Sequence, residues 1–281
     1  MPSFHSLFAA LFIIALSFQA ACEEASRNTD RKPRPAASET RDDNVLKCKF
    51  IWCPPGSFTM GYNPTEFDPD PDLKRVPVTL TNGFWLGQSE VTQMQWRQLM
   101  NTSPWEGKSY ARSGDNLPAT YVSYNDALLF CEKLTEQERA AGRLTIAEKC
   151  TLPTSAQWEY ACRAGAETRY PFGDVGKPTS VPPVVDEKHP HLIGQMAPNP
   201  WGFHDMHGNV WEWTTDGFAD QPVGGQDPTV PPSDFNRVIR GGSWLFQYID
   251  CPSGLRHWES LDSKTGHVGF RIARIPVTSK N

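Results

Sequence analysis

Residues 205–213 read Asp205-Met206-His207-Gly208-Asn209-Val210-Trp211-Glu212-Trp213 and place two tryptophans beside a glycine and an asparagine. The stretch lies within residues 170–236, where Pro, Gly, Asn and Asp dominate and predict loop rather than regular structure. Trp211 and Trp213, like Trp158 and Trp244, are more typical of a core than of an exposed ligand platform. The stretch therefore predicts irregular chain that packed indoles hold in place.

The composition of the whole chain agrees with this prediction. Its 281 residues include 10 Trp, 15 Phe and 7 Tyr, with 25 Pro and 21 Gly. Abundant Pro and Gly disfavour long helices, while the aromatic side chains fill a core. The net charge of −5 comes without a cluster of Lys and Arg, so we expect no nucleic-acid partner.

From residue 45 to residue 281 the pattern predicts one continuous α+β domain without an internal repeat. Alternation predicts strands, the third and fourth as a hairpin, at 49–52, 56–61, 76–80, 84–87, 237–240 and 269–272. Thr92 and Thr154 are candidate N-caps of short helices. Ser123 begins a third helix, whose apolar face holds Tyr124, Ala127, Leu128, Cys131 and Leu134.

The N-terminus predicts export. The apolar run 7–18 is too short to span a bilayer and is typical of a signal peptide, here residues 1–21. The following Ala-Cys junction resembles a bacterial lipoprotein signal, so Cys22 is the candidate for lipidation and for a membrane anchor. Gln19 departs from that pattern, and the alternative is a conventional signal with an incidental cysteine. Residues 22–44 lack large apolar side chains and predict a flexible tether, giving a cell-envelope or secreted protein.

Six cysteines remain after Cys22, an even number that allows three disulfides in an oxidising compartment. Cys48 and Cys53 are close enough in sequence for a local bridge. Cys131 and Cys162 lie on two predicted helices and are candidates for a second bridge. The sequence leaves 15 complete pairings open.

Nine segments, in one order, resemble the formylglycine-generating enzyme, or sulfatase-modifying factor, family. They cover most of the chain from about residue 50 to 275, and are 58–61, 89–92, 122–127, 152–161, 170–174, 198–203, 205–213, 240–244 and 269–271. The resemblance implies a single loop-rich domain related to the C-type lectin fold, with little regular secondary structure.

In that family a segment like 205–213 holds a structural calcium ion. Carried over by position, the ligands are the carboxylates of Asp205 and Glu212 and the carbonyls of Gly208 and Val210. Such hard oxygen ligands suit calcium. The alternative is that both carboxylates only bind nearby amides. A second calcium site of the family lacks its carboxylate here, so we do not expect the second ion.

The resemblance also implies a copper(I) site made by two cysteines five residues apart, shortly after the segment 240–244. Alignment from Gly242 places the first on Cys251 and the second on Arg256. A guanidinium has no lone pair to offer copper, and one thiolate cannot form a linear two-sulfur site. Cys251 alternatively is a buried thiol or a disulfide partner.

Three functions follow from these features. The favoured one is a non-oxidase family member at the cell envelope that binds a protein, peptide or glycan. The alternative is a formylglycine-generating oxidase that uses Cys251 and copper on a sulfatase cysteine. An iron-dependent sulfoxide synthase ranks last, because those proteins carry an additional helical domain.

Overall fold

The structure, a computed structural model, describes residues 39–61, 74–173, 188–246 and 250–277. The predicted signal peptide and Cys22 lie outside the described residues. Within the described ranges, no helix is both long and apolar enough to cross a membrane.

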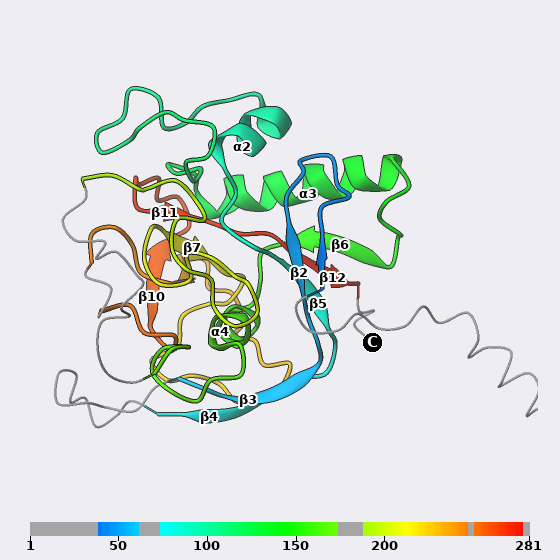
Figure 1. The fold of residues 1–281 in the computed structure, drawn as a ribbon, viewed down its shortest axis with the longest axis vertical. Helices are drawn as coiled ribbons and strands as arrows, with labels where there is room; N and C mark the ends of the chain where they lie inside the picture. Colours follow the sequence, from blue (N-terminus) through cyan, green and yellow to red (C-terminus); the bar gives the residue numbers. More distant parts are fainter. Residues whose placement is uncertain (1–38, 62–73, 174–187, 247–249, 278–281) are drawn as a thin grey trace, which may run out of the picture. The chain divides into compact units, whose positions relative to one another are not determined.

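A five-stranded antiparallel sheet organises the described part of the chain (Figure 1). Its order is β1-β2-β5-β12-β6, with bounds Thr40–Arg41, Phe50–Cys53, Phe84–Gly87, Ala273–Pro276 and Glu148–Thr151. The last strand of the chain, β12, pairs with both β5 and β6. The end of the domain is therefore built into the middle of the sheet.

Two smaller sheets complete the strands. The first has the order β10-β9-β7-β11, with bounds Arg256–Ser260, Asn236–Arg240, Trp211–Trp213 and Val268–Gly269. The second is β3-β4-β8, with bounds Gly56–Met60, Val76–Leu80 and Gly225–Gln226. The predicted hairpin of residues 76–80 and 84–87 is wrong, because β4 pairs with β3 and β8 while β5 enters the larger sheet.

Three helices begin at the predicted caps: α2 (Gln93–Met100), α3 (Tyr124–Ala140) and α4 (Ser155–Arg163). Thr92, Ser123 and Thr154 each accept a hydrogen bond from the backbone amide three residues later. The residue at that third position returns a side-chain bond to the cap's own amide, which completes a capping box.

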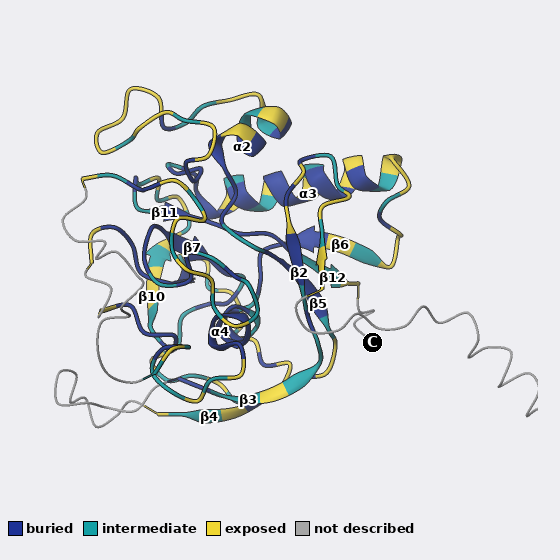
Figure 2. Cartoon of the chain, in the orientation of Figure 1, coloured by how far each residue is buried: buried dark blue, intermediate teal, exposed yellow. Residues whose placement is uncertain are grey.

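The large sheet separates two apolar clusters. Trp85 of β5 lies in the cluster that contains the inner face of α3, while its neighbours Phe84 and Leu86 lie in the cluster that contains α4. Successive residues of a strand point to opposite faces, so α3 and α4 cover opposite faces of the sheet. Burial follows these layers (Figure 2), and the four tryptophans predicted for the core, Trp158, Trp211, Trp213 and Trp244, are buried.

The first described strand, β1, lies before Val45, the residue at which the sequence predicted the domain to start. Strand β1 pairs with β2, and the Trp52 amide donates to the Glu39 carbonyl at 2.9 Å. The Arg41 guanidinium lies 5.1 Å from the centre of the Trp85 ring. Backbone pairing and this cation–π contact order a polar segment that has no large apolar side chain to bury.

Candidate functional site

The loop of residues 205–213 is held by the segment that begins at Gly241. Gly208 and Asn209 have φ values of 112° and 57°, which reverse the chain before β7. The Gly208 amide donates to the Gly241 carbonyl, and the Trp244 amide donates to the Asn209 carbonyl, both at 2.8 Å. Two of the segments that carry the family resemblance therefore form one structural unit.

Glu212 lies in β7, is inaccessible to solvent and accepts three hydrogen bonds. Arg271 donates to both carboxylate oxygens from Nε and Nη2 at 2.6 Å, and Trp158 Nε1 donates to Oε2 at 2.8 Å. Arg271 also donates to the carbonyl of His204, next to Asp205, at 3.1 Å. This bidentate pair fixes the segment between β11 and β12 to the loop of residues 205–213.

Two further buried carboxylates, Asp205 and Glu90, extend this charge cluster. Asp205 Oδ2 accepts from the Gly194 amide at 2.5 Å, and Glu90 Oε1 accepts from Asn209 Nδ2 at 2.9 Å. Their other oxygens, Asp205 Oδ1 and Glu90 Oε2, have no hydrogen-bond partner among the described residues. Burial, and then the charges of Asp205 and Glu212, raise the pKa of Glu90 well above its usual value.

The predicted calcium ligands thus lie on one loop, beside the buried carboxyl group of Glu90. Three carboxylates, those of Glu90, Asp205 and Glu212, face one guanidinium, that of Arg271. The bare oxygen of Asp205 fits a hard cation, and Glu212 Oε1, which accepts one bond, keeps acceptor capacity. No group of three or more His, Cys, Asp or Glu side chains in the described ranges has the arrangement to hold a metal, so a calcium ion here requires backbone carbonyls.

Cys251 is fully buried behind Gly242. A Cβ built on Gly242 would lie 2.1 Å from the Cys251 Sγ atom, so the thiol occupies the space that only glycine leaves. Burial, and then the charge of Asp250, raise the pKa of the Cys251 thiol to about 12. The Cys251 carbonyl contacts His207 Nδ1 at 2.8 Å, and His207 Nε2 lies 3.5 Å from Cys162 Sγ. The surroundings hold Cys251 as a neutral thiol rather than a thiolate.

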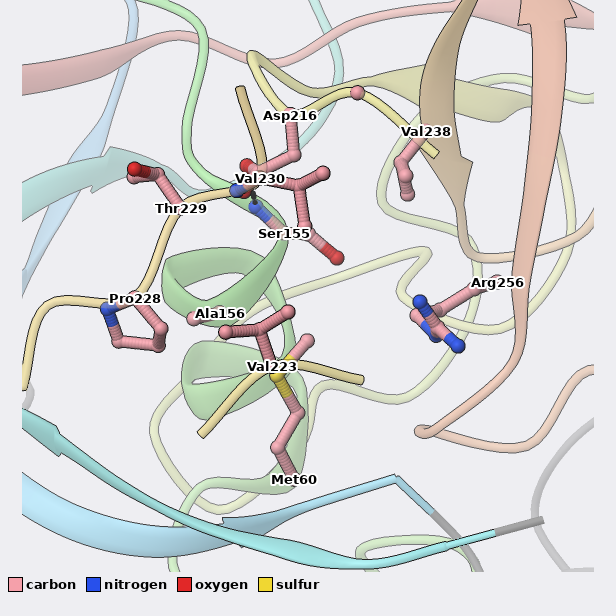
Figure 3. Close-up of a pocket in the computed structure, with 11 residues that line it drawn as sticks. Met60, Ser155, Ala156, Asp216, Val223, Pro228, Thr229, Val230, Val238 and Arg256 are labelled. Carbon is pink, nitrogen blue, oxygen red and sulfur yellow. Dashed lines mark hydrogen bonds between the residues drawn. The ribbon is translucent and has the colours of Figure 1, made fainter. Parts of the chain in front are cut away.

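Arg256 lies on β10 and binds a different part of the chain. Its Nη1 and Nη2 donate to the carbonyls of Ala219 and Asp220 at 3.0 and 2.9 Å. Figure 3 shows its guanidinium on one side of a pocket, opposite Ser155, the first residue of α4, and Asp216, whose carboxylate accepts from the Ser155 amide. The enclosed part has room for about one water molecule.

Neither position five residues from Cys251 in the sequence is a cysteine. Arg256 lies five positions after it, and Phe246 lies five positions before it. Phe246 is 43% exposed and packs its ring edge-on against Trp211, with the ring centres 5.9 Å apart. Whether Cys251 corresponds to the first or to the second cysteine of the family's copper pair, the other position of the pair holds a residue without a thiol.

Cys48, Cys53, Cys131 and Cys162, the four cysteines of the two predicted disulfides, are free thiols in this structure. Cys48 and Cys131 belong to the apolar cluster on the α3 side, and Cys53 and Cys162 to the cluster on the α4 side. The members of each predicted pair therefore lie on opposite faces of the sheet in this structure.

Sequence reasoning assigned no role to Glu90, His207 or Arg271, although all three lie in segments that carried the family resemblance. Their contacts join positions far apart in the chain, as in the pair of Arg271 with Glu212. The only signal in the sequence was a charged or polar residue inside an otherwise apolar motif, and that signal does not identify the partner.

Comparisons with known proteins identify the family. Residues 36–276 match the family model of the sulfatase-modifying factor enzyme 1-like domain. A formylglycine-generating enzyme of Streptomyces coelicolor is 34% identical over 63% of this chain and 60% of its own length. The bovine formylglycine-generating enzyme is 31% identical over 57% of this chain and 45% of its own length. This chain thus spans about half the length of these relatives.

Two further relatives extend the range of named functions. The mouse protein named inactive C-alpha-formylglycine-generating enzyme 2 is 31% identical over 72% of this chain and 61% of its own length. The structure of PvdO from Pseudomonas aeruginosa superposes with a TM-score of 0.72 at 26% identity, over 86% of this chain and 100% of the other. The match over residues 36–276, with the mixed, sheet-rich architecture, places the chain in the sulfatase-modifying factor enzyme 1-like family.

Proposed function

We propose that this chain is a non-oxidase member of its family, which binds a protein, peptide or glycan at the cell envelope. The observation that carries the proposal is the surroundings of Cys251, a buried thiol with Phe246 and Arg256 at the two positions five residues away in the sequence. A linear copper(I) site needs two thiolates, and this segment offers one thiol.

A binding role is supported by aromatic side chains around the buried Trp211. Phe246 and Trp258 are 43% and 46% exposed, and the His257 ring lies between Trp211 and Trp258, with centre distances of 5.8 and 6.2 Å. Exposed aromatic rings present large, rigid contact area to peptide or sugar.

The alternative is a formylglycine-generating oxidase, favoured by the presence of Cys251 and by the relatives named for that activity. The two functions separate when the purified protein is incubated with copper and a Cys-x-Pro-x-Arg peptide while the peptide mass is followed. We expect no conversion of the peptide cysteine to an aldehyde. Conversion that Cys251→Ser abolishes would establish the oxidase instead.

Calcium is proposed as a structural ion of the loop, held by Asp205, Glu212 and the carbonyls of Gly208 and Val210. When bound, it would offset the negative charge that gathers around Arg271. We expect a chelator to lower the melting temperature of the protein and Asp205→Ala to remove the response to chelator. An unchanged melting temperature with chelator would exclude a structural ion at this loop.

The membrane anchor is proposed from the sequence around Cys22. Lipidation predicts that the expressed protein partitions into detergent and that Cys22→Ser moves it to the aqueous phase. Equal partitioning of the two forms would favour a conventional signal peptide.

A further inference from the structure

Cys131 of α3 and Cys150 of β6 lie in the same apolar cluster, where one hydroxyl connects them. Thr135 Oγ1 donates to the Cys131 carbonyl at 2.8 Å and accepts from the Cys150 amide at 2.9 Å. The same hydroxyl lies 3.3 Å from the Cys150 carbonyl. One side chain, that of Thr135, therefore links the backbone at Cys131 to the backbone at Cys150.

Both cysteines are buried in the apolar cluster where α3 packs against β6. Helix α3 packs against β6 through the face that carries Cys131, which is 1% exposed. In β6 the Lys149 side chain is exposed and Cys150 is 6% exposed, so the alternation of the strand turns Cys150 away from solvent toward the cluster that α3 covers. This pair lies on one face of the sheet, unlike either disulfide predicted from the sequence.

We propose that Cys131 and Cys150 form a disulfide when the chain folds in an oxidising medium. The two S–H bonds break and one S–S bond forms. Two protons and two electrons pass to a small disulfide donor, whose S–S bond breaks to give two thiols. The inference is independent of the proposed function, because it concerns the packing of α3 on the sheet and not the loop around Cys251.

The timing of this step follows from burial. Burial raises the pKa of Cys150 to about 12, and it raises the pKa of Cys131 well above its usual value. Since the thiolate is the attacking species, the folded, reduced protein reacts slowly. The bond therefore forms during folding, before α3 closes over β6.

The test compares the full chain unfolded under reducing conditions and refolded with or without oxidised glutathione. Remaining thiols are alkylated after acid quenching, and the digest is analysed by mass spectrometry without reduction. We expect one cross-linked peptide pair joining Cys131 to Cys150. The bond closes a loop of about 20 residues, so the oxidised protein should melt about 5–10 °C higher.

Matched variants keep the test decisive. Cys131→Ala should leave Cys150 alkylated and abolish the difference in melting temperature between the oxidised and reduced protein. Cys162→Ala removes another buried thiol and should preserve both the cross-linked peptide and that difference. Circular dichroism of the reduced variants checks that each one folds. Alkylation of both Cys131 and Cys150 after oxidative refolding would overturn the proposal, and so would a bond from Cys150 to Cys48.

Discussion

Gly242 is the residue beside Cys251 at which the structure leaves no room for a side chain. Its φ is +80°, a conformation that an L side chain rarely adopts, and a Cβ there would lie 2.1 Å from the Cys251 Sγ. Gly107 has a similar φ of +69° with no atom within 4 Å of an added Cβ. Substitution of Gly107 therefore tests backbone strain alone, whereas substitution of Gly242 adds a steric overlap with Cys251.

We predict that Gly242→Ala lowers the free energy of unfolding by about 3 kcal/mol, the sum of the positive-φ cost and of overpacking. Gly107→Ala should cost about 1 kcal/mol, from the backbone alone. Urea denaturation of both variants measures the difference. Cys251→Ala in the Gly242→Ala background should recover part of the loss, and equal losses at the two glycines would contradict the packing of Cys251 against Gly242.

His207 predicts a pH dependence of stability. Burial lowers the pKa of His207 from 6.5 to about 4. The unfolded chain therefore binds a proton on this histidine between pH 6.5 and about 4 while the folded chain does not, so stability falls as the pH falls through that window. The contribution lost between pH 7.5 and pH 5 is about 2 kcal/mol.

His207→Gln should remove this contribution. The measurement is the free energy of unfolding of both proteins at pH 7.5 and pH 5, and the fall on acidification should be about 2 kcal/mol smaller in the variant. Identical falls would mean that His207 is protonated in the folded protein. The matched control is His191→Gln, because His191 is another histidine whose ring nitrogen contacts a backbone carbonyl, that of Leu192. Its fall in the free energy of unfolding on acidification should equal that of the wild type.

At the residue level, the sequence located the candidate residues better than their partners. Family motifs led to Asp205, Glu212 and Cys251. The pairing of Glu212 with Arg271 spans 59 positions, and no local pattern encodes such a contact. The two disulfides predicted from the sequence pair thiols that lie on opposite faces of the sheet in this structure, and proximity in sequence does not reveal that arrangement.

At the level of elements, the helix caps give a direct prediction. Thr154 accepts from the Gln157 amide at 3.1 Å, and Gln157 Oε1 accepts from the Thr154 amide at 2.9 Å. Thr154→Ala should lower the free energy of unfolding by about 1 kcal/mol, whereas Thr154→Ser should be nearly neutral. Thermal unfolding of the two variants measures this, and equal losses would show that the threonine methyl group, rather than the hydroxyl, matters.

Helix starts and most strands were predictable because their signals are local. A cap needs residues three positions apart, and β4 occupies the same residues, 76–80, as predicted. Strands β6 and β10 gave no clear alternation, and β12 follows the predicted strand 269–272 rather than coinciding with it. Their place in the sheets depends on pairing with distant strands, which also explains the failed hairpin.

At the scale of the whole molecule, composition and motif order predicted an irregular α+β domain, and the family match over residues 36–276 confirms it. The sequence could not predict that β12 lies between β5 and β6 in the large sheet. This strand joins β5 and β6 and places Arg271, just before it, at Glu212 of the loop. Positions far apart in the chain therefore meet at the loop of residues 205–213.

Copper(I) binding tests this central claim most directly. The protein is loaded anaerobically with copper(I), desalted and examined for copper content and for sulfur coordination by X-ray absorption. We predict that no copper remains with two sulfur ligands, in the wild type as in Cys251→Ser. One copper per chain held by two sulfurs, and lost in Cys251→Ser, would contradict the assignment of this chain as a non-oxidase.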